Sequence, residues 1–183
     1  MVDLYDARLM QKVKIPVTLD PVRSAQKRSS YDGIVPLKNL ARLSEQLLDT
    51  SGEVTVRIDC EIDEQKLVVL QGEAACEVQV RCERCQQPMT VQLSCQFAFT
   101  PVRSDTKALD HIPERYDVVV TDEHGEVNLQ QLVEDELILT LPMYPMHDER
   151  FCAATDQPQS FGQVQDEPEK PNPFAVLQEL KKK

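Results

Sequence analysis

The stretch C-E-R-C-Q-Q-P, residues 82–88, carries the clearest chemistry in the sequence. Two thiols at C-x-x-C spacing can bind a metal ion, form a redox disulfide, or occupy a hairpin turn without chemical consequence. A structural zinc site needs four ligands, and a C-x-x-C turn supplies two because it directs both sulfurs towards one point. Residues of P-M-Y-P-M-H-D-E-R-F-C, further along the chain, are candidates for the other two. The candidate metal ligands are therefore Cys82, Cys85, His147 and Cys152.

Three observations oppose this Cys3His site. Cys82 is in phase with the apolar face of the preceding residues, H-x4-C is not a recognised half-site, and His147 suits an ordinary surface position. A redox role requires C-x-x-C at the start of a helix, whereas this pair closes a hairpin. We therefore expect no cofactor, and structural zinc remains the alternative.

The residues around the cysteine pair form the strongest pattern in the chain. Apolar and polar side chains alternate over residues 53–63, 67–82 and 89–99, which predicts three strands with one buried face. The turns between them are short, so we expect an antiparallel meander with C-E-R-C-Q-Q-P between its second and third strands. Gly72 suggests a bulge or bend in the second strand. Cys60, Cys76 and Cys95 lie in phase with the apolar faces, where free thiols serve as small hydrophobic groups.

Other elements flank this meander. We expect an edge strand over residues 12–19, a helix from Asp20 to about residue 30, a leucine-rich helix over residues 37–49, and a short strand over residues 116–120. A further helix opens at Asn128 and stops before Pro142. The predicted fold class is α+β, an antiparallel β-meander packed with a few short helices and followed by an acidic, partly disordered C-terminal tail.

The chain divides into four parts. Met10 offers an alternative start, so residues 1–9 are a possible N-terminal extension. Residues 10–152 form a single domain. Residues 153–173 are rich in proline, acids and amides, which predicts a disordered linker. Residues 174–183 carry apolar side chains at helical spacing before three lysines, which predicts a short C-terminal helix.

Charge and composition restrict the classes of binding partner and of activity that the sequence supports. The 183 residues carry a net charge of −11, so the surface as a whole repels phosphate and favours basic partners. No apolar run is long enough for a membrane span and no export signal is evident, which indicates a cytoplasmic protein with reduced thiols. The sequence also lacks motifs for nucleotide binding or nucleophilic catalysis, which favours a protein without enzymatic activity or a small-molecule substrate.

Two charged groups stand out against this background. Residues 11–30 hold five basic side chains against one acid, an arrangement suited to RNA or another acidic partner. These candidate binding residues are Lys12, Lys14, Arg23, Lys27 and Arg28. The acidic run at residues 134–136 is predicted to be a solvated helix face, because consecutive helical residues point in different directions.

Several motifs together resemble the YceD-type large ribosomal RNA subunit accumulation proteins of bacteria. They are M-Q-K-V-K-I-P-V-T-L-D-P-V-R, C-E-R-C-Q-Q-P, F-T-P-V-R-S-D, V-E-D-E-L-I-L-T-L-P and K-P-N-P-F-A-V-L-Q-E-L-K, in that order from residue 10. The resemblance implies a non-enzymatic cytoplasmic ribosome biogenesis factor required for 23S rRNA accumulation, through synthesis, processing or assembly of the large ribosomal subunit. Many relatives carry further cysteines after the proline-rich stretch, where this chain has only His147 and Cys152.

The implied partner is a ribosomal protein, 23S rRNA or its precursor, or both. A strongly acidic chain with one basic flank fits a basic ribosomal protein more readily than direct RNA binding, which would depend on the small basic group alone. The alternative is a zinc-stabilised protein-interaction module without direct RNA contact.

Overall fold

The computed structural model describes residues 14–103 and 112–154. The predicted N-terminal extension, Lys12, the C-terminal helix and nearly all of the predicted linker lie outside these residues. The elements are β1 (Thr18–Leu19), α1 (Pro21–Gln26), β2 (Ser30–Pro36), the 3-10 turn η1 (Leu37–Asn39), α2 (Ala41–Ser44), β3 (Glu53–Ile62), β4 (Val68–Arg81), β5 (Pro88–Val102), β6 (Asp117–Val120), β7 (Val127–Asn128), α3 (Leu129–Thr140) and the 3-10 turn η3 (Glu149–Phe151).

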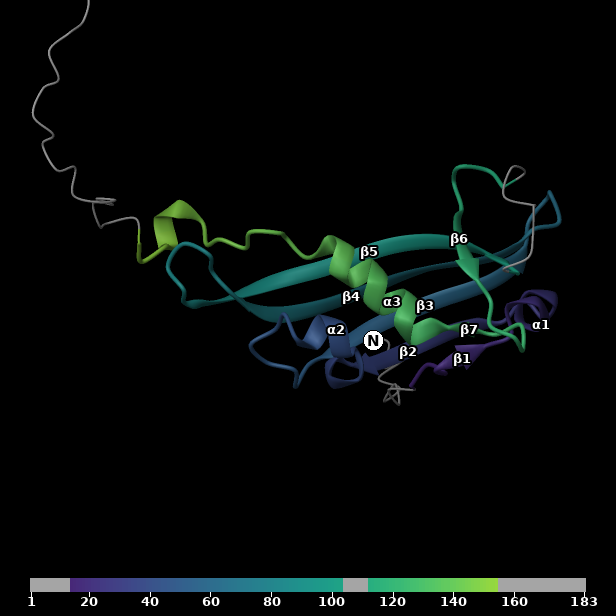
Figure 1. The fold of residues 1–183 in the computed structure, drawn as a ribbon, viewed down its shortest axis with the longest axis horizontal. Helices are drawn as coiled ribbons and strands as arrows, with labels where there is room; N and C mark the ends of the chain where they lie inside the picture. The colour runs from purple at the N-terminus through teal and green to yellow at the C-terminus, as the bar shows by residue number, and fades with distance from the viewer. Residues whose placement is uncertain (1–13, 104–111, 155–183) are drawn as a thin grey trace, which may run out of the picture. The chain divides into compact units, whose positions relative to one another are not determined.

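A five-stranded sheet forms the centre of the fold, with the strand order β2-β3-β4-β5-β6 (Figure 1). The first four strands are antiparallel neighbours, and β6 runs parallel to β5. The predicted meander is therefore confirmed as β3, β4 and β5. The α+β class is confirmed as well, since helices accompany a mostly antiparallel sheet.

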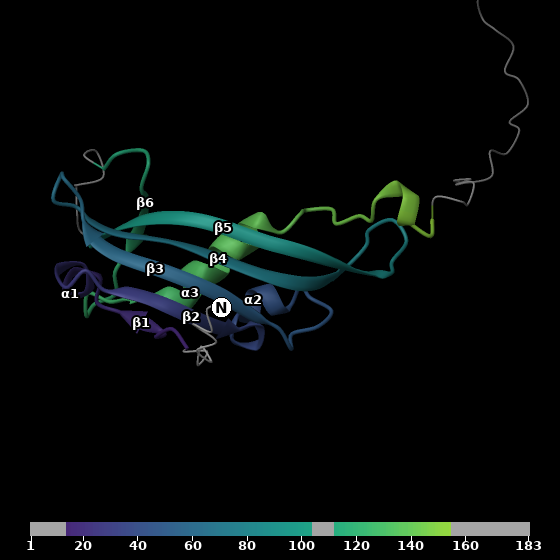
Figure 2. The same cartoon turned by 180° about the vertical axis from the view of Figure 1, so that it is seen from behind.

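One face of the sheet is apolar because alternate residues of the long strands point to the same side. Figure 1 shows α3 lying across this face, whereas Figure 2 shows the strands from the opposite side with no helix in front of them. The core contains Val54, Val56, Ile58, Cys60, Ala74, Cys76, Val78, Val80, Leu93, Cys95, Phe97 and Phe99 from the strands, with Leu129, Val133 and Leu137 from α3. The opposite face of β3 and β4 carries exposed polar side chains.

Gly72 does not form the predicted bulge. The pairing of β3 with β4 and of β4 with β5 continues through it without a skipped residue, opposite Ile58 on one side and Phe97 on the other. A Cβ atom at this position would overlap the carbonyl oxygen of Arg57 and lie 2.9 Å from the ring of Phe97. Glycine is required here because neighbouring atoms approach the backbone closely.

The N-terminal third differs most from the sequence predictions. Within residues 14–19, the described part of the strand expected over residues 12–19, the structure has the two-residue β1, which pairs with β7 in a separate small sheet, and an isolated bridge at Lys14. The edge strand β2 was not predicted. The leucine-rich helix over residues 37–49 is two short turns, η1 and α2, in which Leu37, Leu40 and Leu43 are buried as expected.

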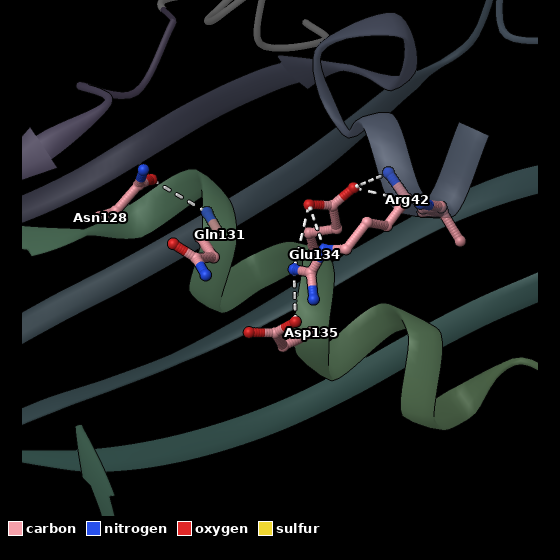
Figure 3. Close-up of polar contacts among 6 residues, drawn as sticks. Arg42, Asn128, Gln131, Glu134 and Asp135 are labelled. Atoms are coloured by element: carbon pink, nitrogen blue, oxygen red, sulfur yellow. Dashed lines mark hydrogen bonds and ion pairs between the residues drawn. The ribbon is translucent and has the colours of Figure 1, made fainter. Parts of the chain in front are cut away.

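Figure 3 shows two polar interactions of α3, the cap at its first turn and the contact of Glu134 with α2. Asn128 caps α3 by accepting a hydrogen bond of 3.0 Å from the backbone N–H of Gln131. Glu134 is buried, which contradicts the expectation that the whole acidic run is solvated. Its Oε1 accepts hydrogen bonds from the backbone N–H groups of Arg42 and Leu43, at 2.7 and 3.1 Å, so a residue of α3 caps α2. The Arg42 guanidinium also pairs with Glu134 and Asp135.

Candidate metal centre

The C-x-x-C pair lies at the tip of the long β4–β5 hairpin. The last residue of β4 paired with β3 is Ala75, and beyond it the strand pairs with β5 as far as Arg81 opposite Pro88. The connection between them is a tight turn, in which Gln86 N–H donates to the Cys82 carbonyl at 2.9 Å and Gln86 adopts a φ of 62°. This turn places both cysteine side chains on one side of the tip.

A second segment reaches the same tip from α3. Residues 141–152 leave the end of α3 and run alongside the hairpin (Figure 1). The backbone N–H of Glu83 donates to the carbonyl of Pro145 at 2.8 Å, which joins the two segments. Asp148 caps η3 through the N–H of Arg150, and this 3-10 turn brings Cys152 back towards the hairpin.

The four predicted ligands meet at this junction. The sulfur atoms of Cys82, Cys85 and Cys152 and a ring nitrogen of His147 all lie within 4.8 Å of one another. Cys85 Sγ is 3.3 Å from His147 Nδ1, and the backbone N–H of His147 donates to Cys82 Sγ at 3.4 Å. All six cysteines of the chain lie in the described residues as free thiols. Cys82 and Cys152 are buried, and the other two side chains are partly exposed.

His147 is held in the orientation that a metal ligand needs. Its Nε2 lies 3.2 Å from the carbonyl oxygen of Pro88. A carbonyl oxygen only accepts hydrogen bonds, so in the neutral imidazole Nε2 carries the proton and Nδ1 presents its lone pair to Cys85 Sγ. A second hydrogen bond of this kind orients most metal-binding histidines.

The thiols have unequal acidities. Burial raises the pKa of Cys82, but hydrogen bonds from the backbone N–H groups of Cys85, His147 and Arg84 outweigh burial and lower the pKa to about 6. The N–H of Gln87 lowers the pKa of Cys85, yet burial and the thiols of Cys82 and Cys152 outweigh it and raise the pKa. The backbone thus favours one thiolate at the tip, while crowding of sulfur atoms opposes a second.

The C-x-x-C spacing identified Cys82 and Cys85, but no recognised spacing indicated how His147 and Cys152 join them. H-x4-C is not recognised as a half-site because its two side chains converge only through the turn η3. The prolines that stop α3 were the available signal, since they force an extended chain from the helix towards the hairpin.

The basic candidates lie elsewhere. Arg23 is on α1, Lys27 and Arg28 follow it directly, and all three side chains are exposed. Lys14 is exposed as well and forms an isolated bridge with Ile34. Asp20 caps α1 as predicted, accepting from Arg23 N–H at 2.9 Å. None of these four residues belongs to the cysteine cluster.

An exposed apolar segment that was not predicted runs from the end of α3 to the residue before Cys152. The four most exposed large hydrophobic side chains of the described chain, each at least 68% exposed, lie within residues 139–151. With one less exposed neighbour, this apolar arm consists of Leu139, Met143, Tyr144, Met146 and Phe151. Exposed apolar groups gathered in one segment are typical of an interaction site.

The fold and the site define a small α+β protein whose long hairpin carries a cluster of three thiols and an imidazole beside an exposed apolar segment. The family model described as large ribosomal RNA subunit accumulation protein YceD matches residues 70–181. A protein of Haemophilus influenzae with the same description is 42% identical over 175 residues, which cover 95% of this chain and all of that relative.

The chain therefore belongs to the YceD family, which is associated with accumulation of the large ribosomal subunit RNA. The resemblance noted from the motifs is confirmed. No solved structure matches the chain. Over residues 14–103 and 112–154, no helix is long and apolar enough to cross a membrane.

Proposed function

We propose that the protein is a non-enzymatic, cytoplasmic factor that supports accumulation of 23S rRNA by binding a basic ribosomal protein through the apolar arm. The observation that carries this proposal is the arm itself. Its five side chains are exposed to solvent in the described chain. Burial of aromatic and methionine side chains against a partner contributes much of the binding free energy of an interface.

Charge selects the class of partner. The chain carries a net charge of −11. The exposed acid Glu83 lies on the hairpin tip, and the exposed acids Asp148 and Glu149 lie at the start of η3 within the segment that carries the arm. Arg84 and Arg150 are also present there, so the local field is mixed rather than uniformly negative. A basic protein with apolar anchors complements such a surface, whereas bare RNA would be repelled by most of the molecule.

The basic residues on and after α1 complete this proposal. Arg23, Lys27 and Arg28 contact rRNA or its precursor weakly, together with Lys12 and Lys14, while the arm holds the protein partner. A few exposed cations supply a salt-dependent, sequence-independent attraction to phosphate. The factor would therefore bring a ribosomal protein to the RNA without catalysing a reaction.

Site-specific photo-crosslinking in growing cells tests this proposal. A photoreactive amino acid replaces Tyr144 in the arm, Lys27 after α1, or Gln96 on the open face of the sheet as a matched control. We expect position 144 to give an adduct with a basic large-subunit protein, position 27 to give RNA adducts, and position 96 to give neither. RNA adducts at position 144, or no ribosomal protein at any position, would contradict the proposal.

A functional readout accompanies the crosslinks. In cells that lack the gene, the variant Met143→Ser/Tyr144→Ser should restore 23S rRNA poorly, whereas Val22→Ser/Leu48→Ser, which also removes two exposed apolar side chains, should restore it fully. Equal restoration by the two variants would show that the arm is not the working surface.

A second candidate function is a zinc-stabilised protein-interaction module without direct RNA contact. The convergence of four sulfur and nitrogen donors favours it. It differs from the first in one outcome of the crosslinking, because position 27 would then give no RNA adduct.

A further inference from the structure

We propose that Cys82, Cys85, His147 and Cys152 bind one structural zinc ion, which clamps the segment after α3 to the tip of the β4–β5 hairpin. This inference goes beyond the first proposed function and specifies the ion and ligands for the second, and it is independent of which partner the arm takes. It depends on the geometry of four side chains from two segments that are far apart in the sequence.

The distances suit a tetrahedral ion. With Zn–S bonds of about 2.3 Å, the sulfur atoms of a tetrahedral site are about 3.8 Å apart. The four donor atoms already lie within 4.8 Å of one another, so an ion draws them together by movements of an ångström or less. The lone pair of His147 Nδ1 faces Cys85 Sγ at 3.3 Å, with the opposite ring nitrogen fixed by Pro88.

The donor set selects zinc. Three thiolates and one imidazole are soft and borderline ligands, which suit Zn²⁺ and exclude the oxygen-seeking Mg²⁺ and Ca²⁺. All four tetrahedral positions are filled by the protein, so no position remains for water or substrate. The ion is therefore structural and not catalytic.

A disulfide accounts for less of the arrangement. A bond between Cys82 and Cys85 requires neither Cys152 nor the orientation of His147, yet both side chains converge on the pair. A bond from either cysteine to Cys152 leaves the lone pair of His147 facing sulfur without a partner. Only a shared ion uses all four donors at once.

The clamp explains how residues 142–151 keep their place. None of these residues is buried, so they lack the apolar packing that normally fixes a segment. Their links to the hairpin include the hydrogen bond from Glu83 to Pro145, the contacts of His147, and a long contact of 3.9 Å between Arg84 and Met146. A metal ion adds four strong bonds to this small set. Under the proposed function, on which this step rests, the ion also fixes the apolar arm.

Elemental analysis of the purified full-length chain tests the proposal. The protein is prepared under reducing conditions without chelator, and any metal-free portion is then titrated with Zn²⁺. We expect one zinc per chain. Substitution by Co²⁺ should give thiolate charge-transfer bands and the intense visible bands of a tetrahedral site. A folded chain that neither contains nor takes up zinc, or one that holds iron instead, would overturn the assignment.

Matched variants locate the site. Cys152→Ala and His147→Ala each remove one ligand, and Cys76→Ala and His124→Ala remove a buried thiol and an exposed imidazole outside the cluster. We expect at least about a tenfold loss of zinc retained against a competing chelator for the first two, because a three-ligand site loses much of its affinity, and no change for the controls. Equal retention in all four would refute the ligand set.

Hydrogen exchange of the unmodified chain covers the case in which a ligand variant does not fold. Removing zinc should speed exchange in residues 141–152 and leave β3 unchanged. Unchanged exchange in residues 141–152 would refute the clamp. A chain without zinc could still give the crosslinks at Tyr144. A chain that gives no such crosslinks could still contain zinc, so the two sets of experiments can refute the two proposals separately.

Discussion

Replacing Glu134 tests how α3 holds the N-terminal third of the chain. The carboxylate accepts hydrogen bonds from the N–H groups of Arg42 and Leu43 and pairs with the Arg42 guanidinium. In Glu134→Ala both N–H groups lose their acceptor where water cannot readily replace it. We expect a loss of about 3 kcal/mol in the free energy of unfolding, since each unsatisfied buried group costs about 1–3 kcal/mol.

The ion pair itself contributes little to this loss. The Arg42 side chain is 51% exposed and retains Asp135, so its share is under about 1 kcal/mol. Glu134→Gln keeps an oxygen that can accept from the N–H groups, and it should cost only about 1 kcal/mol. Asp135→Asn is the matched control, with an expected change within about 0.5 kcal/mol.

Urea unfolding followed by far-ultraviolet circular dichroism measures these differences, because the chain contains no tryptophan for fluorescence. An Ala variant that costs less than about 1 kcal/mol would show that the N–H groups find other partners. A Gln variant as damaging as Ala would show that charge, and not hydrogen-bond acceptance, is the dominant effect. Either result would refute the reasoning.

Gly72→Ala should lower the free energy of unfolding by about 2 kcal/mol or more in the same urea assay, because the added methyl group overlaps the backbone of Arg57; a loss below about 0.5 kcal/mol would contradict this. Asp20→Ala should cost about 1 kcal/mol through loss of the α1 cap, and Asp20→Asn much less. Burial raises the pKa of the Cys60 thiol to about 11, as it does for Cys76. Unfolding exposes thiols that ionise near pH 9, so stability should fall between pH 9 and 11, and Cys76→Ala should flatten that fall.

Strict alternation made the long strands readable from the sequence. Over residues 53–62 every second side chain is apolar, and a period of two over ten residues has no helical interpretation. Strand β2 was not predicted because Gly33 and Pro36 interrupt its pattern. Among the strands of the described chain its neighbour in the sheet is β3, and Lys14 adds an isolated bridge. An edge strand buries less, so its sequence carries a weaker signal.

Other parts of the fold and of the candidate site depend on long-range contacts, which local sequence patterns do not reveal. The leucines at residues 37–43 have helical spacing and are buried, yet the helix is broken at Leu40, whose backbone is not helical (φ −98°, ψ 83°). The cap of α2 then comes from the distant Glu134 and not from a neighbouring residue. In the same way C-x-x-C is visible locally, while convergence with His147 and Cys152 depends on a turn and on the path of the chain after α3. Local spacing identifies the residues, and only tertiary structure pairs them.

The order of synthesis determines how early the contact between Arg42 and Glu134 can form during folding. The two residues are 92 positions apart, and β1 likewise finds its partner β7 only after more than half of the chain has been made. The strands β3, β4 and β5 pair with close neighbours and can form hairpins as they emerge from the ribosome. Strand β1 and Arg42, which are translated early, therefore gain these partners late in synthesis.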